Sequence, residues 1–179
     1  MATISTLGEG RLLPLRRKIA MIFQHFNLMP SRTVLDNVTL PLIHEKVSRK
    51  DARAKAMHLL ELVGIADKAK AYPRQLSGGQ QRRVEIARAL LKGGEIFLFD
   101  EITSELDTDT TNRLLAGLAE ETVGKTVVFV SHDWAEIQQA ERILVVDQGQ
   151  IVQDGKTEAL LQSEGLFRTL FLSEVTHHE

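Results

Sequence analysis

Short apolar runs alternate with amphipathic segments over most of this chain. The apolar runs predict strands at 18–23, 95–100, 126–130 and 142–147, since runs of this length suit a buried strand. Apolar residues at helical spacing predict helices at about 33–40, 48–63, 79–91, 108–121, 133–140, 156–161 and 166–172. Residues 1–17 show no clear period. The alternation of strand and helix indicates an α/β fold with a parallel sheet.

The helix predicted from residue 48 has the clearest boundaries. Ser48 and Asp51 resemble a capping box with Asp in place of Glu, and Gly64 ends the pattern. One face of this helix is apolar and carries Ala52, Ala56, Leu59, Leu60 and Val63. Because residues 33–92 contain helices without a strand, we expect one domain in which 33–92 is an inserted helical subdomain and 1–32 with 93–179 forms the sheet.

A second local pattern predicts a hairpin after the strand at 142–147. Gln148 and Gly149 form a typical two-residue turn, leading into a strand at 150–153.

Composition narrows the class of protein. The 179 residues carry a net charge of −2, which gives no drive towards nucleic acid or an anionic membrane, and we expect no nucleic-acid partner. No apolar run approaches the ~20 residues of a membrane span. The first residues lack the basic start and apolar core of a secretory signal, and the chain has no cysteine. We therefore expect a cytoplasmic protein.

The first stretch with recognisable chemistry is Leu76-Ser77-Gly78-Gly79-Gln80. Ser77 is a favourable N-cap, and glycine lets a ligand approach the backbone closely. The exposed amides of a first helical turn, together with the helix dipole, attract anions. The alternative interpretation is an ordinary capped helix.

The second stretch is the apolar run 96–99, which ends in Asp100 and Glu101. Its length predicts a strand buried on both faces of a parallel sheet. Open α/β sheets bind ligands at the carboxyl ends of their strands, where one carboxylate can hold Mg²⁺ and its neighbour can act on a water molecule. The alternative is an exposed acidic strand end.

Two further candidates follow strands. Gln24 begins a polar loop after the strand at 18–23, and its amide oxygen can reach a metal ion or its water. His132 comes directly after the strand at 126–130 and can hydrogen-bond a phosphate. On spacing alone, Gln24 is equally well explained as a solvated loop amide, and a lone histidine is more often an ordinary surface residue.

Together these residues resemble the ATPase cassette of ABC transporters. Five motifs occur in the family's order over roughly residues 18–160: Gln24, Leu76–Gln80, Asp100-Glu101, Ser104–Asp107 and Ser131-His132. The resemblance implies a P-loop NTPase-like (RecA-like) fold that binds ATP and Mg²⁺ and hydrolyses ATP to drive transport.

The resemblance also implies a role for each matching residue. Asp100 and Gln24 would bind Mg²⁺, Glu101 would act on water, and His132 would bind the γ-phosphate. The residues that would contact nucleotide are Gln24, Leu76, Ser77, Gly78, Gly79, Gln80 and Asp107. The signature would close the site of a second subunit in a head-to-tail dimer. Permease subunits would be the other partners, and would hold the chain at the inner face of the cell membrane.

Different parts of the sequence resemble different subtypes of transporter. Residues 23–42 resemble methionine importers, which makes an amino acid such as methionine the candidate solute, whereas residues 124–172 look more like exporters. Ile102 and Glu105 depart from the family, which usually has proline or alanine at the first position and alanine at the second. The extra carboxylate of Glu105 would lie near the dimer seam, where it could repel phosphate or pair with a partner's cation.

The sequence lacks one motif of the family, the phosphate loop G-x-x-x-x-G-K-[ST] upstream of Gln24. Gly124-Lys125-Thr126 does not supply it, since Ala119 stands where the first glycine belongs and a strand follows. We therefore expect an N-terminally incomplete version of the fold that leaves an exposed sheet edge or an apolar patch. We also expect the chain to bind ATP weakly and to be inactive alone.

Two hypotheses for function follow. The first is the ATPase subunit of an importer, and the alternative is a non-catalytic cassette that donates its signature to a complete ATPase or binds a membrane subunit. A cassette protein acting on ribosomes or DNA is disfavoured, because the second cassette or long coiled coil usual in such proteins does not appear.

Overall fold

The computed structural model describes residues 8–22, 27–43 and 45–176. Contacts divide the chain into two compact units, Met1–Val130 and Ser131–Glu179, a boundary that the sequence did not predict. The first unit contains, in chain order, α1 (Glu9–Lys18), β1 (Ile19–Ile22), α2 (Val34–Thr39), η2 (Leu40–Leu42), α3 (Arg49–Leu62), η3 (Ala66–Lys68), η4 (Pro73–Gln75), α4 (Gly78–Lys92), β2 (Ile96–Asp100), α5 (Thr108–Glu121) and β3 (Thr126–Val130). The second unit contains α6 (Trp134–Ile137), β4 (Ile143–Asp147), β5 (Gln150–Gly155), α7 (Thr157–Gln162) and α8 (Leu166–Thr176).

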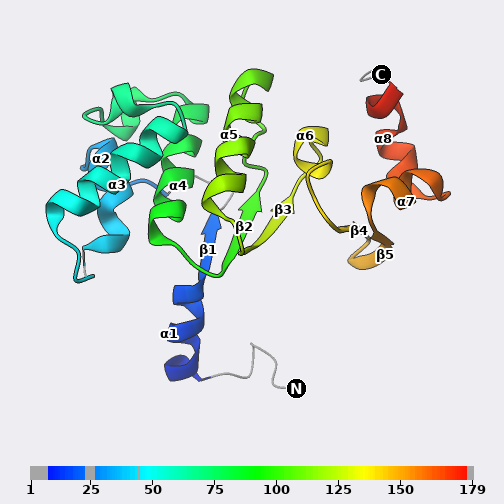
Figure 1. The fold of residues 1–179 in the computed structure, drawn as a ribbon, viewed down its shortest axis with the longest axis horizontal. Coiled ribbons are helices and arrows are strands. Elements are labelled where there is room, and N and C mark those ends of the chain that lie inside the picture. Colours follow the sequence, from blue (N-terminus) through cyan, green and yellow to red (C-terminus); the bar gives the residue numbers. More distant parts are fainter. Residues whose placement is uncertain (1–7, 23–26, 44, 177–179) are drawn as a thin grey trace. The chain divides into compact units, whose positions relative to one another are not determined.

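The sheet of the first unit is parallel and has the order β1-β2-β3 (Figure 1). Its register aligns Ile22 with Phe99 and Phe99 with Phe129, so these side chains share one face. Phe99 is only 1% exposed, and its ring lies 5.3 Å from that of Phe129. The predicted α/β class and the predicted strands of this sheet are therefore confirmed.

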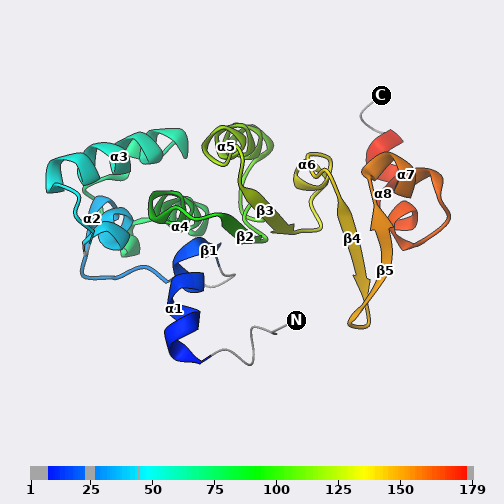
Figure 2. The ribbon, with the colours of Figure 1, turned by 60° about the horizontal axis from the view of Figure 1, so that its bottom comes forward.

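The opposite face of the sheet is open. Met21 is 44% exposed and Val128 is 41% exposed, whereas α4 packs against β1 and α5 lies above β3 (Figure 2). The prediction that the strand at 96–100 is buried on both faces is wrong, because in the described residues helices cover one face only. No strand of the described chain pairs with the outer edge of β3, where Val130 is 59% exposed. Of the two expected alternatives, the exposed sheet edge is present.

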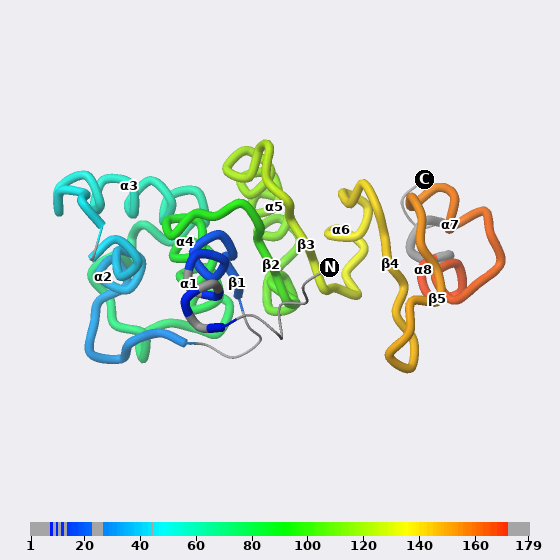
Figure 3. Tube along the Cα trace, turned by 90° about the horizontal axis from the view of Figure 1, so that it is seen from below, coloured from blue at the N-terminus to red at the C-terminus, as the bar shows by residue number. Residues whose placement is uncertain are grey.

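The helices between β1 and β2 gather at one end of the first unit, where α2 and α3 pack on α4 (Figure 3). Ser48 caps α3 as the sequence predicts, since its Oγ accepts a hydrogen bond from the Asp51 amide at 3.1 Å. The predicted capping box forms only in this half, because the Asp51 carboxylate accepts from the Ser48 hydroxyl at 2.7 Å. The five apolar residues of the α3 face are buried, and Gly64 ends the helix with φ of +69°. After α2, the chain continues into the short 3-10 helix η2, which contains Pro41.

Two helices differ from the expectation. α1 was not predicted, because Gly8, Gly10 and Pro14 argue against a helix, yet three basic residues in its last turn complement the helix dipole. The helix predicted at 133–140 spans only Trp134–Ile137. Its two large apolar residues, Trp134 and Ile137, supply one turn of packing on the core of the second unit.

The second unit is built on an antiparallel hairpin of β4 and β5. Gln148 and Gly149 form the turn with φ values of +46° and +76°, as the sequence predicted. Val145 from the hairpin packs in a small core with residues of α7 and α8, namely Leu160 and Phe167. No helix in the described part of the chain is both long and apolar enough to cross a lipid bilayer.

Candidate functional site

The signature residues start α4 through a reciprocal pair of caps. Ser77 Oγ accepts a hydrogen bond from the Gln80 amide at 3.3 Å, and the Ser77 amide donates to Gln80 Oε1 at 3.1 Å. This capping box explains why the helix begins at Gly78. Leu76 is buried, and its carbonyl accepts from the Gln81 side chain. The side chains of Leu76 and Gln80 therefore have structural roles in the isolated chain.

Gly78 and Gly79 give room to the chain's own turn at 103–106. A Cβ on Gly79 would lie 2.9 Å from the carbonyl oxygen of Glu105 and 3.2 Å from Leu106 Cδ2. A Cβ on Gly78 would collide with the Glu105 carboxylate. The two glycines thus permit close approach of protein, in addition to the expected approach of ligand. The extra carboxylate of Glu105 lies directly beside the predicted anion site.

The carboxyl end of β2 brings Asp100 and Glu101 together as predicted. Asp100 is the last residue of β2, and both residues are half-buried. Glu101 has a φ of +49°, an uncommon conformation for a residue with a Cβ. Its amide donates to the Val130 carbonyl at 2.9 Å, and its carbonyl accepts from Ser104 Oγ at 3.1 Å. These bonds hold a sharp turn at the edge where ligands of such sheets bind.

Asp107 is the N-cap of α5. Its carboxylate accepts hydrogen bonds from the Thr110 amide at 2.9 Å and from the Thr110 hydroxyl at 2.7 Å. These bonds, with that of the hydroxyl foremost, lower the pKa of the Asp107 carboxyl. The residue predicted to contact nucleotide therefore also fixes the start of a helix.

Two candidates remain, Gln24 and His132. Gln24 lies outside the described residues. His132 belongs to the second unit, two residues after Val130, which pairs with Asp100 in the sheet. The first unit thus contains two neighbouring groups. One is the signature with Glu105 beside it, and the other is the strand end with Asp100 and Glu101. Residues 102–104 connect the two groups in the chain.

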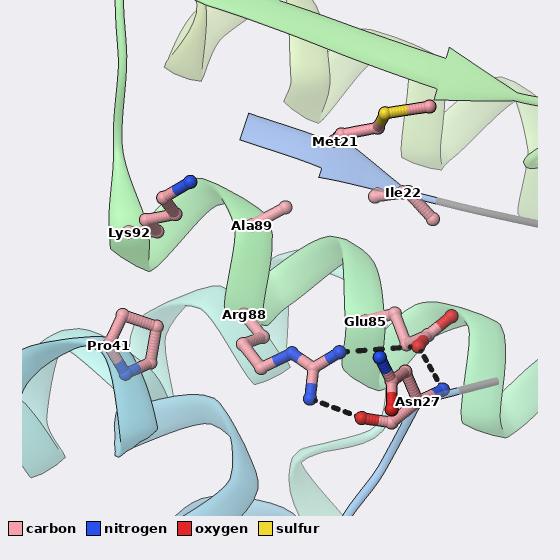
Figure 4. Close-up of a pocket in the computed structure, with 8 residues that line it drawn as sticks. All are labelled: Met21, Ile22, Asn27, Pro41, Glu85, Arg88, Ala89 and Lys92. Atoms are coloured by element: carbon pink, nitrogen blue, oxygen red, sulfur yellow. Dashed lines mark hydrogen bonds and ion pairs between the residues drawn. The ribbon is translucent and has the colours of Figure 1, made fainter. Parts of the chain in front are cut away.

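Sequence reasoning missed a polar cluster on the middle of α4. This helix carries three arginines, Arg82, Arg83 and Arg88, and Arg82 is only 4% exposed. Arg88 contacts Glu85 and Asn27 beside a cavity of about 160 Å³ (Figure 4). The sequence did contain a signal for this cluster, because Glu85 lies three residues from both Arg82 and Arg88. Buried cations require a partner, and this spacing supplies one on the same helix.

The site offers oxygen donors for a divalent cation. Asp100 supplies a carboxylate at the strand end, and within the described ranges no group of three or more His, Cys, Asp or Glu residues gathers as a metal site. Mg²⁺ commonly binds through one or two carboxylates, with phosphate and water filling the other positions. The residues present fit that mode of binding.

Comparison with known proteins identifies the family. The model of the ABC transporter family matches residues 5–104, and this chain belongs to that family. It is 48% identical over 156 residues to a methionine import ATP-binding protein, MetN, of Rhizobium johnstonii, which covers 86% of this chain and 43% of the relative. The MetN of Carboxydothermus hydrogenoformans is 47% identical, with 85% and 46% covered. The chain thus spans less than half the length of these curated relatives.

Solved structures agree with this assignment. A dimeric bacterial ABC transporter cassette, MJ0796, superposes with a TM-score of 0.78 at 38% identity, over 86% of this chain and 69% of that one. A bacterial Atm1-family ABC exporter with ATP bound gives a TM-score of 0.81 at 28% identity, over 91% and 30%. The fold is therefore that of an ABC ATPase cassette.

Proposed function

We propose that this chain acts as an ATP-hydrolysing subunit of an ABC transporter and couples hydrolysis to import of a small solute. The observation that carries the proposal is the Asp100-Glu101 pair at the carboxyl end of the middle strand of a sheet of this family. An amino acid, methionine first, is the proposed solute, because the relatives that match most of this chain are named as methionine import proteins.

Each role in the proposed mechanism follows from the chemistry of one side chain. Asp100 would hold Mg²⁺, which neutralises phosphate charge when bound. Glu101 would orient the attacking water and accept its proton. His132 would donate a hydrogen bond to the terminal phosphate, and Gln24 would sense the metal and the membrane subunit. Ser77, the glycines beside it and Asp107 would close on nucleotide held by a second subunit.

The proposed assembly has two kinds of partner. A second cassette is supported by the dimeric state of the similar cassette MJ0796. Permease subunits are supported by the importer names of the relatives, and would place the chain at the inner face of the cell membrane.

A second candidate function rests on a different observation. The 179 residues contain no G-x-x-x-x-G-K-[ST] loop, whose backbone amides and lysine bind the phosphates in this class of ATPase. In this second candidate function, the chain hydrolyses no ATP in its own site. It contributes Ser77–Gln80 to the nucleotide site of a complete cassette.

Two mixed assemblies separate the candidates, each formed from this chain, a complete cassette and a permease. If the partner cassette has its own catalytic glutamate replaced by glutamine, any remaining hydrolysis reports on Glu101 of this chain. The first proposal predicts that Glu101→Gln lowers this rate by about a hundredfold, the usual contribution of a general base. Glu95→Gln is the matched control, because Glu95 lies just before the opposite end of β2 and pairs with Lys18 on the surface.

With an unmodified partner, the second candidate predicts that Ser77→Ala lowers hydrolysis in the partner's site while Glu101→Gln does not. Calorimetry of the purified chain with Mg-ATP supplies an independent measurement. Micromolar binding by this chain alone would contradict the second candidate. If neither substitution changes hydrolysis by either assembly, both candidates are wrong.

A further inference from the structure

The side chain of Glu105 lies against the first residue of the signature helix. A Cβ on Gly78 would collide with Glu105 Oε2 and would lie 3.3 Å from Oε1. Gly78 is the first residue of α4, a helix of 15 residues. A carboxylate therefore lies at the end of α4 that carries the positive half of the helix dipole.

The amides of Gly78 and Gly79 are the groups that an anion would bind at this end of α4. The capping box bonds the amides of Ser77 and Gln80 to side chains. Among the described residues, no hydrogen bond uses the amides of Gly78 and Gly79. Glu105 thus adds negative charge beside these two donors and leaves both of them free, so an anion that approaches them meets that charge.

The backbone fixes the place where the Glu105 side chain begins. In its turn, the Leu106 amide donates to the carbonyl of the buried Thr103 at 2.9 Å. A Cβ on Gly79 would lie only 2.9 Å from the Glu105 carbonyl oxygen, so this turn and the start of α4 are in close contact. The carboxylate can therefore leave Gly78 only by rotation about the side-chain bonds of Glu105.

The charge of Glu105 is not neutralised by an ion pair within the described residues, since none of their ion pairs includes this carboxylate. Arg83 of the same helix is bonded elsewhere. Its Nε donates to the Gly79 carbonyl at 3.3 Å, and its Nη1 donates to the carbonyls of Val63 and Gly64 at 3.3 and 3.4 Å. Glu105 therefore keeps its charge for whatever binds at the start of α4.

We propose that Glu105 is an autoinhibitory residue, whose carboxylate opposes binding of phosphate at the amides of Gly78 and Gly79. It must rotate aside before the signature closes on nucleotide, because two negative groups in contact repel each other strongly. Of the two effects expected of this carboxylate, its position favours repulsion of phosphate. This inference rests on the proposed function, in which Ser77–Gln80 close on nucleotide held by a second subunit, and adds a regulation of that step.

Titration of the purified chain with inorganic phosphate tests the repulsion without a partner or a nucleotide. The NMR signals of the Gly78 and Gly79 amides report binding at the start of α4. Glu105→Gln keeps the size of the side chain and removes its charge. Glu120→Gln is the matched control, because it removes the same charge from an exposed position near the far end of α5.

We expect Glu105→Gln to lower the Kd for phosphate at these amides about tenfold, because it removes one close repulsive charge. Glu120→Gln should leave this Kd unchanged. In about 1 M salt, where the Debye length is ~3 Å, the effect of Glu105→Gln should fall to about twofold. Equal Kd values for wild type and Glu105→Gln, or no response of these amides in either, would overturn the inference. A tenfold effect that salt does not reduce would show a change of shape and overturn it as well.

The mixed assembly with an unmodified cassette supplies the kinetic test, because there the signature of this chain would close the partner's site. Glu105→Gln should lower KM for ATP about tenfold with little change in kcat. A raised KM would show that Glu105 pairs with a cation of the partner.

A raised or an unchanged KM in an active assembly would overturn the inference and leave the proposed function intact. If the wild-type assembly is inactive, the proposed function fails, and the phosphate titration alone decides whether Glu105 repels phosphate.

Discussion

At the scale of single residues, Gly78 and Gly79 are adjacent in sequence but face different neighbours. A side chain on Gly79 meets the backbone carbonyl of Glu105, which cannot move without shifting the turn. A side chain on Gly78 meets only the flexible end of the Glu105 side chain. The same substitution at the two positions should therefore have different consequences.

We predict that Gly79→Ala destabilises the chain by about 1–3 kcal/mol, the usual cost of forced overpacking. Gly78→Ala should be neutral or slightly stabilising, because the Glu105 carboxylate swings away and alanine favours a helix. Urea unfolding of the two variants measures the difference directly. Equal stabilities would contradict the packing of the turn 103–106 against α4.

At the scale of elements, polar caps determine where helices start, and the sequence shows them well. Ser48, Ser77 and Asp107 all cap helices whose starts agree with the predicted ones to within one residue. Packing against the rest of the molecule is less visible in sequence. The length of α6, whose Trp134 and Ile137 pack on the core of the second unit, depends on such packing and was not predicted.

The cap of α5 predicts a dependence of stability on pH. The pKa of Asp107 is lower in the folded chain than in the unfolded chain, so its contribution is present above the unfolded pKa and is lost as pH falls through the folded value. Asp107→Asn keeps a cap acceptor but does not titrate. We therefore expect this variant to lose less stability than the wild type between about pH 6 and about pH 3.

Urea unfolding at the two pH values measures this effect. Asp109→Asn is the control, since it removes the same charge from the same helical turn without changing the bonds to Thr110. If the two asparagine variants show the same pH dependence, the cap of Asp107 is not its cause.

At the scale of the whole molecule, the sequence predicts the class of fold, which is confirmed, and the position of two acids at a strand end, but not the geometry around them. Asp100 and Glu101 were predictable because an apolar run and two acids are local patterns. Glu105 lies beside Gly78, although the two are separated by 27 positions in sequence. Glu85 contacts Asn27, from which it is separated by 58 positions. No periodicity records contacts of this kind, and so the contact of Glu85 with Asn27 and the turn beside the signature appear only in the structure.

The open edge of β3 predicts self-association. Val130 is 59% exposed on this edge, and an uncovered apolar strand is a template for pairing with another chain. We expect Val130→Lys to increase the monomeric fraction at a given concentration, measured by analytical ultracentrifugation. Val123→Lys is the control, because Val123 is more exposed but lies in the turn before β3. An equal effect of both lysines would point to net charge as the cause.

At Glu101 the backbone conformation lowers stability, whereas the carboxylate serves the proposed chemistry. A glutamate with φ of +49° has an unfavourable steric energy that a glycine in the same conformation would not have. Natural proteins lie close above the stability that they need, so substitutions that relieve strain are readily accepted wherever activity does not oppose them. If Glu101 has the role proposed for it in hydrolysis, a lineage released from the demand to hydrolyse ATP would gain stability by losing this carboxylate, and the first sign of lost catalysis would be a glycine at position 101.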